Sequence, residues 1–143
     1  DPDGKIAIYR RPSRPHTIDT VFDTNDISEL PRVDIVPSYA GADGTAIEAF
    51  ISAGTKAIVV STLAPGLPAS PQMEAIKKAL EKNIIVIYST RAGSGRVLRR
   101  QSMIDSGIIA ADNLNPQKAR VLAMLALTKS TDTEVIQNFF DLY

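Results

Sequence analysis

The run Ile84-Ile-Val-Ile-Tyr88 decides the fold that this sequence predicts. It is continuously apolar and mostly β-branched, which is typical of a strand in a sheet that is covered on both faces. Three further short apolar runs are interpreted as strands, at residues 33–36, 57–60 and 107–110. Strands of this kind belong to a parallel sheet when helices separate them.

Helical patterns do separate these strands. The expected helices begin at Thr45, Pro71, Pro116 and about Asp132, and the last two run to about Thr128 and Leu142. Capping boxes are predicted at Thr45–Glu48 and Thr131–Glu134, each a hydroxyl followed three residues later by a glutamate. Asn115 can cap the helix that opens with Pro116, and Gly54 stands where a C′ glycine is expected. The apolar stripes are predicted to be Ile47, Phe50 and Ile51; Met73, Ile76 and Leu80; Val121, Leu122 and Leu125; and Val135, Ile136, Phe139 and Phe140.

The resulting order predicts an α/β fold: a small four-stranded parallel sheet flanked by helices, with right-handed crossovers and helices on both faces. Loops 37–44, 61–70 and 89–105 leave the carboxyl ends of the strands, where ligands bind in such sheets. Residues 10–31 are rich in proline, arginine and acids and are interpreted as an exposed arm, anchored by Val21-Phe22. Residues 5–9 could form one short strand, and Asp1–Gly4 is expected to be a turn inside a longer chain.

Composition excludes several classes of function. The chain has 143 residues and a formal net charge of zero, which argues against a nucleic-acid partner. It has no cysteine and a single histidine, His16, so thiolate chemistry and a His-rich metal site are excluded. No apolar run approaches the ~20 residues of a membrane span, and we expect no membrane partner.

Two features of the loop after the third predicted strand have alternative interpretations. Gly93 and Gly95 could cradle a phosphate, but neither precedes a clear helix, and a flexible loop is favoured. The second feature is a group of arginines that could form an anion site or a subunit contact with a carboxylate, or simply a solvated loop edge. These arginines are Arg91, Arg96, Arg99 and Arg100.

Other candidate groups lack partners. Ser61 and Thr62 follow a strand, but a nucleophilic hydroxyl needs a base, and no lysine or histidine lies nearby in the sequence. We interpret them as polar residues that close the strand, and His16 as a surface residue. Asp34 lies within an apolar strand, either on an edge or interface or as a buried carboxylate, with the edge favoured. The residues alone therefore supply no complete catalytic set.

Several blocks nevertheless resemble the bacterial L-asparaginase and glutaminase-asparaginase family. The most specific is Asn113-Leu-Asn-Pro-Gln-Lys-Ala-Arg-Val-Leu-Ala-Met-Leu-Ala-Leu-Thr128, which resembles the family's C-terminal signature. The other blocks are Arg10–Thr17 with Phe22-Asp23, similar to the family's interdomain segment; Glu29–Val33, similar to the beginning of its C-terminal domain; Ser89–Gly95; Leu125–Lys129; and the end in Tyr143. The resemblance covers nearly the whole chain and implies an end of an N-terminal domain with a linker arm at residues 1–31, and a C-terminal α/β domain at residues 32–143.

The resemblance implies hydrolysis of the side-chain amide of L-asparagine or L-glutamine, without a metal or organic cofactor. In this family the nucleophilic threonine lies in an N-terminal Thr-Gly-Gly-Thr-type loop, and a Gly-Thr-Asp-Thr-type region supplies further groups. Neither motif occurs in this sequence, so no catalytic residue is assigned, and the chain is expected to be inactive alone. The resemblance favours a periplasmic or secreted protein, with a cytoplasmic one as the alternative.

The family's second domain contributes to a tetramer, a dimer of dimers, in which it closes a neighbour's active site. The corresponding pocket-rim residues here are Gly66, Leu67 and Gln101. Leu67 stands where a polar residue is usual, and the stretch Arg99-Arg-Gln-Ser102 lacks the usual glutamate. Gln101 can only hydrogen-bond a substrate amino group. Two other hypotheses stay open: a free-standing α/β module that binds a small anion, and an interaction domain that docks through residues 1–31.

Overall fold

The computed structural model of the chain describes residue 4 and residues 9–63 and 66–143. Its centre is a sheet of four parallel strands in the order β1 (Val33–Pro37), β2 (Ala57–Thr62), β3 (Ile85–Thr90) and β4 (Ile109–Ala110). The predicted sheet is thus confirmed. Strands β2 and β3 extend two residues beyond the predicted ends because Ser61 pairs with Ser89 and Thr62 with Thr90. All positions of both strands are buried.

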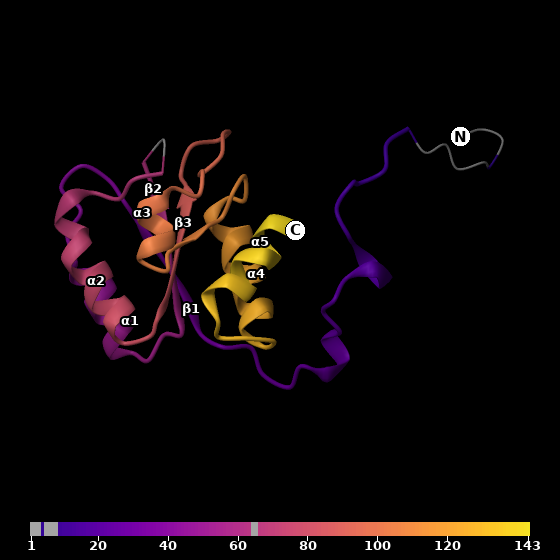
Figure 1. Ribbon diagram of the computed structural model, residues 1–143, viewed down its shortest axis with the longest axis horizontal. Coiled ribbons are helices and arrows are strands. Elements are labelled where there is room, and N and C mark those ends of the chain that lie inside the picture. Colours follow the sequence, from indigo (N-terminus) through magenta and orange to yellow (C-terminus); the bar gives the residue numbers. More distant parts are fainter. Residues whose placement is uncertain (1–3, 5–8, 64–65) are drawn as a thin grey trace.

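The helices form two layers, one on each face of the sheet (Figure 1). Right-handed crossovers that all proceed in one direction put α1 (Thr45–Ser52), α2 (Met73–Glu81) and α3 (Gln101–Asp105) on one face. The other face is covered by α4 (Pro116–Leu127) and α5 (Thr133–Leu142). Short 3₁₀ turns, η1 (Thr17–Asp19), η2 (Thr24–Asp26) and η3 (Ser70–Gln72), complete the described elements.

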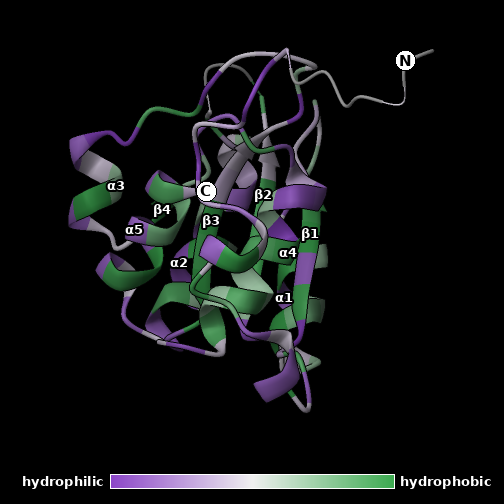
Figure 2. Ribbon diagram, turned by 90° about the vertical axis from the view of Figure 1, so that its right-hand side faces the viewer, coloured by the Kyte–Doolittle hydropathy of each residue, from purple (hydrophilic) through white to green (hydrophobic). Residues whose placement is uncertain are grey.

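Each face of the sheet has its own hydrophobic core. Successive side chains of a strand point to opposite faces, so Val86 and Tyr88 pack with the α1–α2 layer, while Ile85 and Ile87 pack with α4 and α5. Figure 2 shows the hydrophobic residues concentrated on the strands and the helices against them. This explains why the run at residues 84–88 is apolar without interruption.

The ends of α1 and α5 differ from the predicted capping boxes. Thr45 is already helical, and its N–H donates to Asp43 Oδ1 at 3.0 Å. At α5 the cap is Asp132, whose Oδ1 accepts from the N–H groups of Glu134 at 2.9 Å and Val135 at 3.0 Å. In both places a neighbouring carboxylate is a stronger acceptor than the threonine hydroxyl. The predicted Asn115 cap is confirmed by a 2.9 Å bond from the Lys118 N–H.

Three residues of the predicted apolar stripes are exposed. Met73, Val121 and Val135 are 46%, 53% and 40% exposed. In α2 and α4, alanines are buried in place of Met73 and Val121: Ala75 and Ala79 in α2, and Ala119, Ala123 and Ala126 in α4. Small side chains let a helix backbone approach the sheet closely, which turns the larger neighbours outward.

The predicted loop 89–105 contains a helix that the sequence did not reveal. Helix α3 is a single turn with one buried residue, Met103. So short a helix has no apolar repeat to detect and depends on tertiary packing. The predicted strand at residues 5–9 lies outside the described residues except for Tyr9, which has no regular structure.

The arm runs along the side of α4 and α5 (Figure 1). Phe22 anchors it: this side chain is 8% exposed, and its ring centroid lies 5.2 Å from that of Phe139 and 5.4 Å from that of Tyr143. The predicted anchor is confirmed for Phe22, whereas Val21 is half exposed. Within the described residues, no helix has the length and apolar character of a membrane span.

Candidate functional site at the carboxyl edge of the sheet

Three loops leave the carboxyl edge of the sheet, with described residues 38–44 after β1, 63 and 66–69 after β2, and 91–100 after β3. Because the strand order follows the chain order, the described sheet has no switch point at which two crossovers diverge and open a crevice. The site is therefore determined by how these loops pack on one another.

Arg91 ties the three loops together. Its N–H donates to Thr62 O at 3.0 Å, and its Nη1 donates to Ser38 O at 3.0 Å. The Ser38 hydroxyl in turn accepts a 2.7 Å bond from the Ala69 N–H. A residue considered for anion binding thus holds main-chain groups in place.

The hydroxyl groups at the strand ends are structural. Ser61 and Thr62 are 7% and 0% exposed, and Thr62 Oγ1 donates to Ser89 O at 2.8 Å. The Ser89 hydroxyl donates to Leu114 O at 2.7 Å. A hydroxyl that donates to a buried main-chain carbonyl has no base to activate it as a nucleophile. Ser61 and Thr62 are therefore polar residues that end the strand, as predicted.

Gly66 and Leu67 form a tight turn that lies under the loop after β3. Gly66 has φ +102°, and a Cβ on it would lie 2.9 Å from Val97 Cγ1. The Leu63 and Leu67 main chains bridge, with Leu63 N–H donating to Leu67 O at 3.1 Å. The Leu67 side chain is 51% exposed. The turn therefore buries its glycine and presents its leucine at the surface.

Gln101 is the exposed first residue of α3. Its Nε2 donates to Asp105 Oδ1 at 2.8 Å, so this hydrogen bond lies within the helix and does not reach Leu67. The structure thus joins Gly66 to the loop that precedes Gln101, through Val97, and gives Gln101 an acid one turn away.

Carboxylates within the chain neutralise part of the arginine group. Arg96 Nε donates to Asp112 Oδ1, and Arg99 pairs with Glu134. Asp112 Oδ2 accepts a second bond, of 3.1 Å, from Arg14 of the arm. Burial acts to raise the pKa of Asp112, but the hydrogen bonds and charges of Arg96 and Arg14 outweigh it and hold that pKa below its ordinary value. These pairs weaken the hypothesis of a free anion site.

The pair Arg14–Asp112 was not predictable from the sequence. The two residues are 98 positions apart, and Asp112 has φ +49°, which a local pattern does not predict. The one available signal was a lone acid directly after the buried run Ile108–Ala111.

The glycine-rich loop has no phosphate cradle in the described structure. Gly95 has φ +111°, but the following helix begins only at Gln101 and is a single turn. A phosphate site of this type needs a helix N-terminus directly after the glycines.

The remaining titratable groups do not assemble into a catalytic or metal site. His16 is exposed on the arm, 3.3 Å from Thr17 Oγ1, and Asp34 lies on the edge strand β1 beside Arg32 at 2.8 Å, as predicted. Burial raises the pKa of Tyr88 to about 12, and its hydroxyl lies 3.8 Å from Met73 Sδ. Among the residues that the structure describes, no three His, Cys, Asp or Glu side chains form a metal-binding group.

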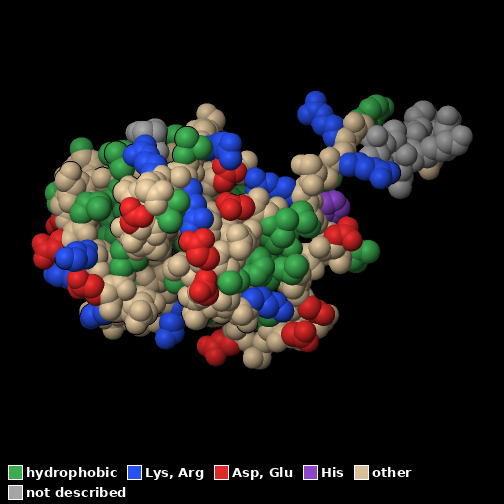
Figure 3. Space-filling model, in the orientation of Figure 1, with side chains coloured by type: hydrophobic (Ala, Val, Ile, Leu, Met, Phe, Trp, Pro, Cys, Tyr) green, Lys and Arg blue, Asp and Glu red, His purple; other side chains and the backbone are tan. Residues whose placement is uncertain are grey.

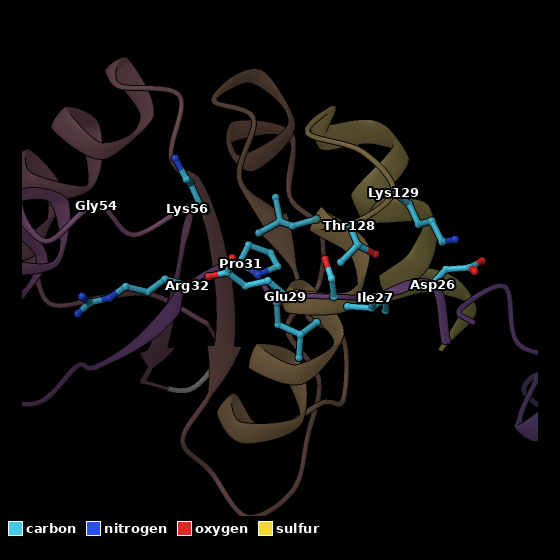
Figure 4. Close-up of a pocket in the computed structure, with 12 residues that line it drawn as sticks. Asp26, Ile27, Glu29, Pro31, Arg32, Gly54, Lys56, Thr128 and Lys129 are labelled. Carbon is cyan, nitrogen blue, oxygen red and sulfur yellow. The ribbon is translucent and has the colours of Figure 1, made fainter. Parts of the chain in front are cut away.

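A hollow of about 620 Å³ lies at the opposite, amino end of the sheet. The cations on its lining, Arg32, Lys56 and Lys129, point away from one another (Figure 4). Arg32 is already paired with Asp34. The hollow therefore has no converging set of charges.

Comparison with known proteins gives this arrangement a family context. Residues 32–140 match the sequence model of the Glutaminase/Asparaginase C-terminal domain. The chain is 38% identical over 131 residues to L-asparaginase 2 of Bacillus subtilis strain 168, covering 92% of this chain and 35% of that protein. It is 35% identical over 140 residues to a probable periplasmic L-asparaginase of Haemophilus influenzae strain KW20, covering 96% and 40%.

A solved structure agrees with these relatives. The crystal structure of a probable cytoplasmic L-asparaginase from Campylobacter jejuni is 41% identical and superposes with a TM-score of 0.93, covering 99% of this chain and 46% of that one. The chain thus spans less than half the length of the proteins it matches.

Proposed function

The chain belongs to the glutaminase/asparaginase family through its C-terminal domain, and we propose that it is the C-terminal part of an amidohydrolase that acts on L-asparagine or L-glutamine. The observation that carries the proposal is the match of residues 32–140 to this domain, with a superposition over 99% of the chain. Residues 1–31 would be the end of the N-terminal domain and the linker, and residues 32–143 the C-terminal α/β domain.

The nucleophile of the proposed reaction is a threonine outside this chain. Its hydroxyl oxygen would attack the side-chain amide carbon, ammonia would leave, and water would then hydrolyse the acyl-enzyme ester to the acid. The buried, hydrogen-bonded state of Thr62 and Ser89 supports this division, since neither hydroxyl is presented to a substrate. No metal or organic cofactor enters the proposed reaction.

The role proposed for this domain is to form an oligomer interface and the rim of a neighbouring subunit's active site, in a tetramer built as a dimer of dimers. Gly66, Leu67 and Gln101 are the proposed rim residues. The exposure of Leu67 on a turn held by the Leu63–Leu67 bridge supports a contact role for its side chain. Gln101 is exposed as well, with its amide held by Asp105.

A substitution at Leu67 tests whether this residue belongs to the proposed active-site rim. In the complete enzyme, Leu67→Asn introduces the polar group that is usual there. We expect KM for L-asparagine to change while the free energy of unfolding stays the same, because the side chain is exposed. The matched control is Leu98→Asn, at a position that is 62% exposed on the neighbouring loop. Equal KM values for both variants and the unaltered enzyme would remove Leu67 from the rim.

The proposed function itself is tested by joining the N-terminal part of the Campylobacter relative to residue 1 of this chain. The proposal expects ammonia release from L-asparagine or L-glutamine by this chimera and none by either part alone. A folded chimera without amidase activity would contradict it.

The compartment that we propose is the periplasm or the exterior, with the cytoplasm as the alternative. The names of the relatives point both ways, one being called periplasmic and another cytoplasmic. Fractionation of the source cells, followed by detection of the chain with an antibody, distinguishes the two.

A further inference from the structure

An apolar groove of about 590 Å³ separates the arm from α4. We call it the arm groove. Its apolar lining comes from the arm, from α4 and the loop before it, and from the C-terminus: Pro15, Phe22, Leu114, Val121, Leu122, Leu125 and Tyr143. The titratable groups on its edge include His16 and Lys118, and no acid is among the described residues that line it. In Figure 3, hydrophobic side chains gather on the side of the body that faces the arm.

The walls of the arm groove are held by specific contacts. Tyr143 Oη accepts hydrogen bonds from Thr20 Oγ1 at 3.0 Å and from the Val21 N–H at 2.9 Å. Phe22 packs on the ring of Tyr143 and is almost fully buried. These contacts hold the arm against the C-terminal residue at one end of the groove.

Helix α4 is apolar on two sides, and one of them has no described partner. Ala119, Ala123 and Ala126 face the sheet, whereas Val121, 53% exposed, lines the groove. A helix that is apolar on more than one side normally packs against a second neighbour. The arm carries further exposed apolar groups, Tyr9 at 92% and Ile18 at 95%.

We propose that the arm groove is covered by the N-terminal part of the same, longer protein, an inference that rests on the proposed function. The arm precedes β1 in the chain, and its residues Pro15, Thr20 and Phe22 line the groove. Toward its N-terminal end the arm extends away from the helices and the sheet (Figure 1). A preceding domain is therefore tethered next to the groove at a high effective concentration.

The comparison with the Campylobacter structure shows that a relative has further chain which could act as this occupant. The superposition on the Campylobacter structure includes the arm, since it covers 99% of this chain, while the remaining 54% of that chain has no counterpart here. The arm therefore has the same conformation as the matching segment of the Campylobacter protein, which is more than twice as long as this chain. The arm groove is lined mostly by apolar side chains, which suits contact with an apolar segment of the preceding domain.

The absence of cysteine from this sequence makes the occupant directly testable by labelling. Val121→Cys places a thiol in the arm groove, and Val135→Cys is the matched control, 40% exposed on α5 and outside the groove lining. Maleimide labelling of each site is followed by mass spectrometry of its peptide, in the 143-residue chain and in the chimera with the Campylobacter N-terminal part.

In the chain alone, we expect both sites to react readily. In the chimera, burial should slow labelling at position 121 by about tenfold or more and leave position 135 within about twofold. Unchanged labelling of position 121 in the chimera would overturn the proposal. Protection of position 121 in the chain alone that grows with protein concentration would also overturn it and assign the groove to a second copy.

A mixture of the separate N-terminal part with each cysteine variant repeats the comparison without the fused junction, in case the chimera does not fold. The outcome is distinguishable from failure of the proposed function. Protection of position 121 in a chimera that releases no ammonia would contradict the proposed activity and uphold the groove.

Discussion

Arg14 of the arm and Asp112, in the loop between β4 and α4, form a hydrogen-bonded ion pair of 3.1 Å between Nη2 and Oδ2. The other oxygen of Asp112 accepts from Arg96, and its carbonyl accepts a 2.9 Å bond from the Val97 N–H. Val97 in turn lies against Gly66. Asp112 therefore connects the arm to the loop that packs on the proposed rim.

Replacing this carboxylate should loosen both attachments. Asp112→Asn keeps the shape of the side chain, and asparagine tolerates the φ of +49°. We expect the free energy of unfolding to fall by about 1 kcal/mol, since Arg96 and Arg14 are partly exposed and solvent screens the pairs. Urea denaturation measures the change. An unaltered midpoint would mean that the pairs contribute nothing to stability.

The same residue predicts an acid-dependent loss of stability. The pKa of Asp112 lies below its ordinary value of 3.8 because Arg96 and Arg14 outweigh the effect of burial. A lowered pKa in the folded state contributes stability at a pH above 3.8, and this contribution is lost as the pH falls through the folded value. The difference in unfolding free energy between the unaltered chain and Asp112→Asn should therefore shrink below about pH 4. A constant difference from pH 7 to pH 3 would contradict this assignment.

The Gly66 turn should not tolerate a side chain. Gly66→Ala imposes a φ of +102° on alanine and brings its Cβ to 2.9 Å from Val97 Cγ1 and 3.3 Å from Cγ2. The cost should be about 2 kcal/mol, seen as a lower thermal midpoint. Gly93→Ala is the matched control, because nothing lies within 4 Å of the added Cβ. Equal midpoints for the two variants would contradict the packing of this turn under Val97.

Loss of the Phe22 ring should free the arm without unfolding the domain. The arm is joined to the sheet at one end only, so Phe22→Ala can detach it locally, and the global loss should stay below the roughly 3–5 kcal/mol typical of a core phenylalanine. We expect faster proteolysis between residues 9 and 21. Ile18→Ala, at a side chain that is 95% exposed, should leave the cleavage rate as it is. Equal rates for both variants would show that the ring does not hold the arm.

Alkaline titration reports on the core around Tyr88. Burial raises the pKa of this hydroxyl from 10.0 to about 12, so the neutral form is favoured in the folded state. The stability that this provides is complete below pH 10 and is lost as the pH rises toward 12. Tyrosinate absorbance should show a late step near pH 12 that Tyr88→Phe removes. A titration unchanged by Tyr88→Phe would contradict the burial of this group.

The sequence predicted the sheet well because its signal is local. The composition of residues 84–88 alone indicates a buried strand. The pair Asn115-Pro116 alone indicates a capped helix start. The predictions failed where a neighbour decided the outcome: Asp132 displaced Thr131 as the cap, alanines displaced Val121 from the core, and α3 depends on the burial of Met103.

The candidate site was less predictable for the same reason. The arginines of the loop at residues 91–100 suggested a ligand or a partner, but their acceptors, Asp112 and Glu134, lie farther along the chain and are brought close only by the fold. Such pairs leave no spacing rule in the sequence. The family resemblance located Gly66, Leu67 and Gln101, and their role as a rim stays a prediction.

Ammonia release by the purified 143-residue chain tests the central claim most directly. With L-asparagine or L-glutamine, the chain alone should release no more ammonia than buffer, and the chimera with the Campylobacter N-terminal part should release it catalytically. Sustained release by the chain alone, in proportion to its concentration, would contradict the claim that the nucleophile lies outside it.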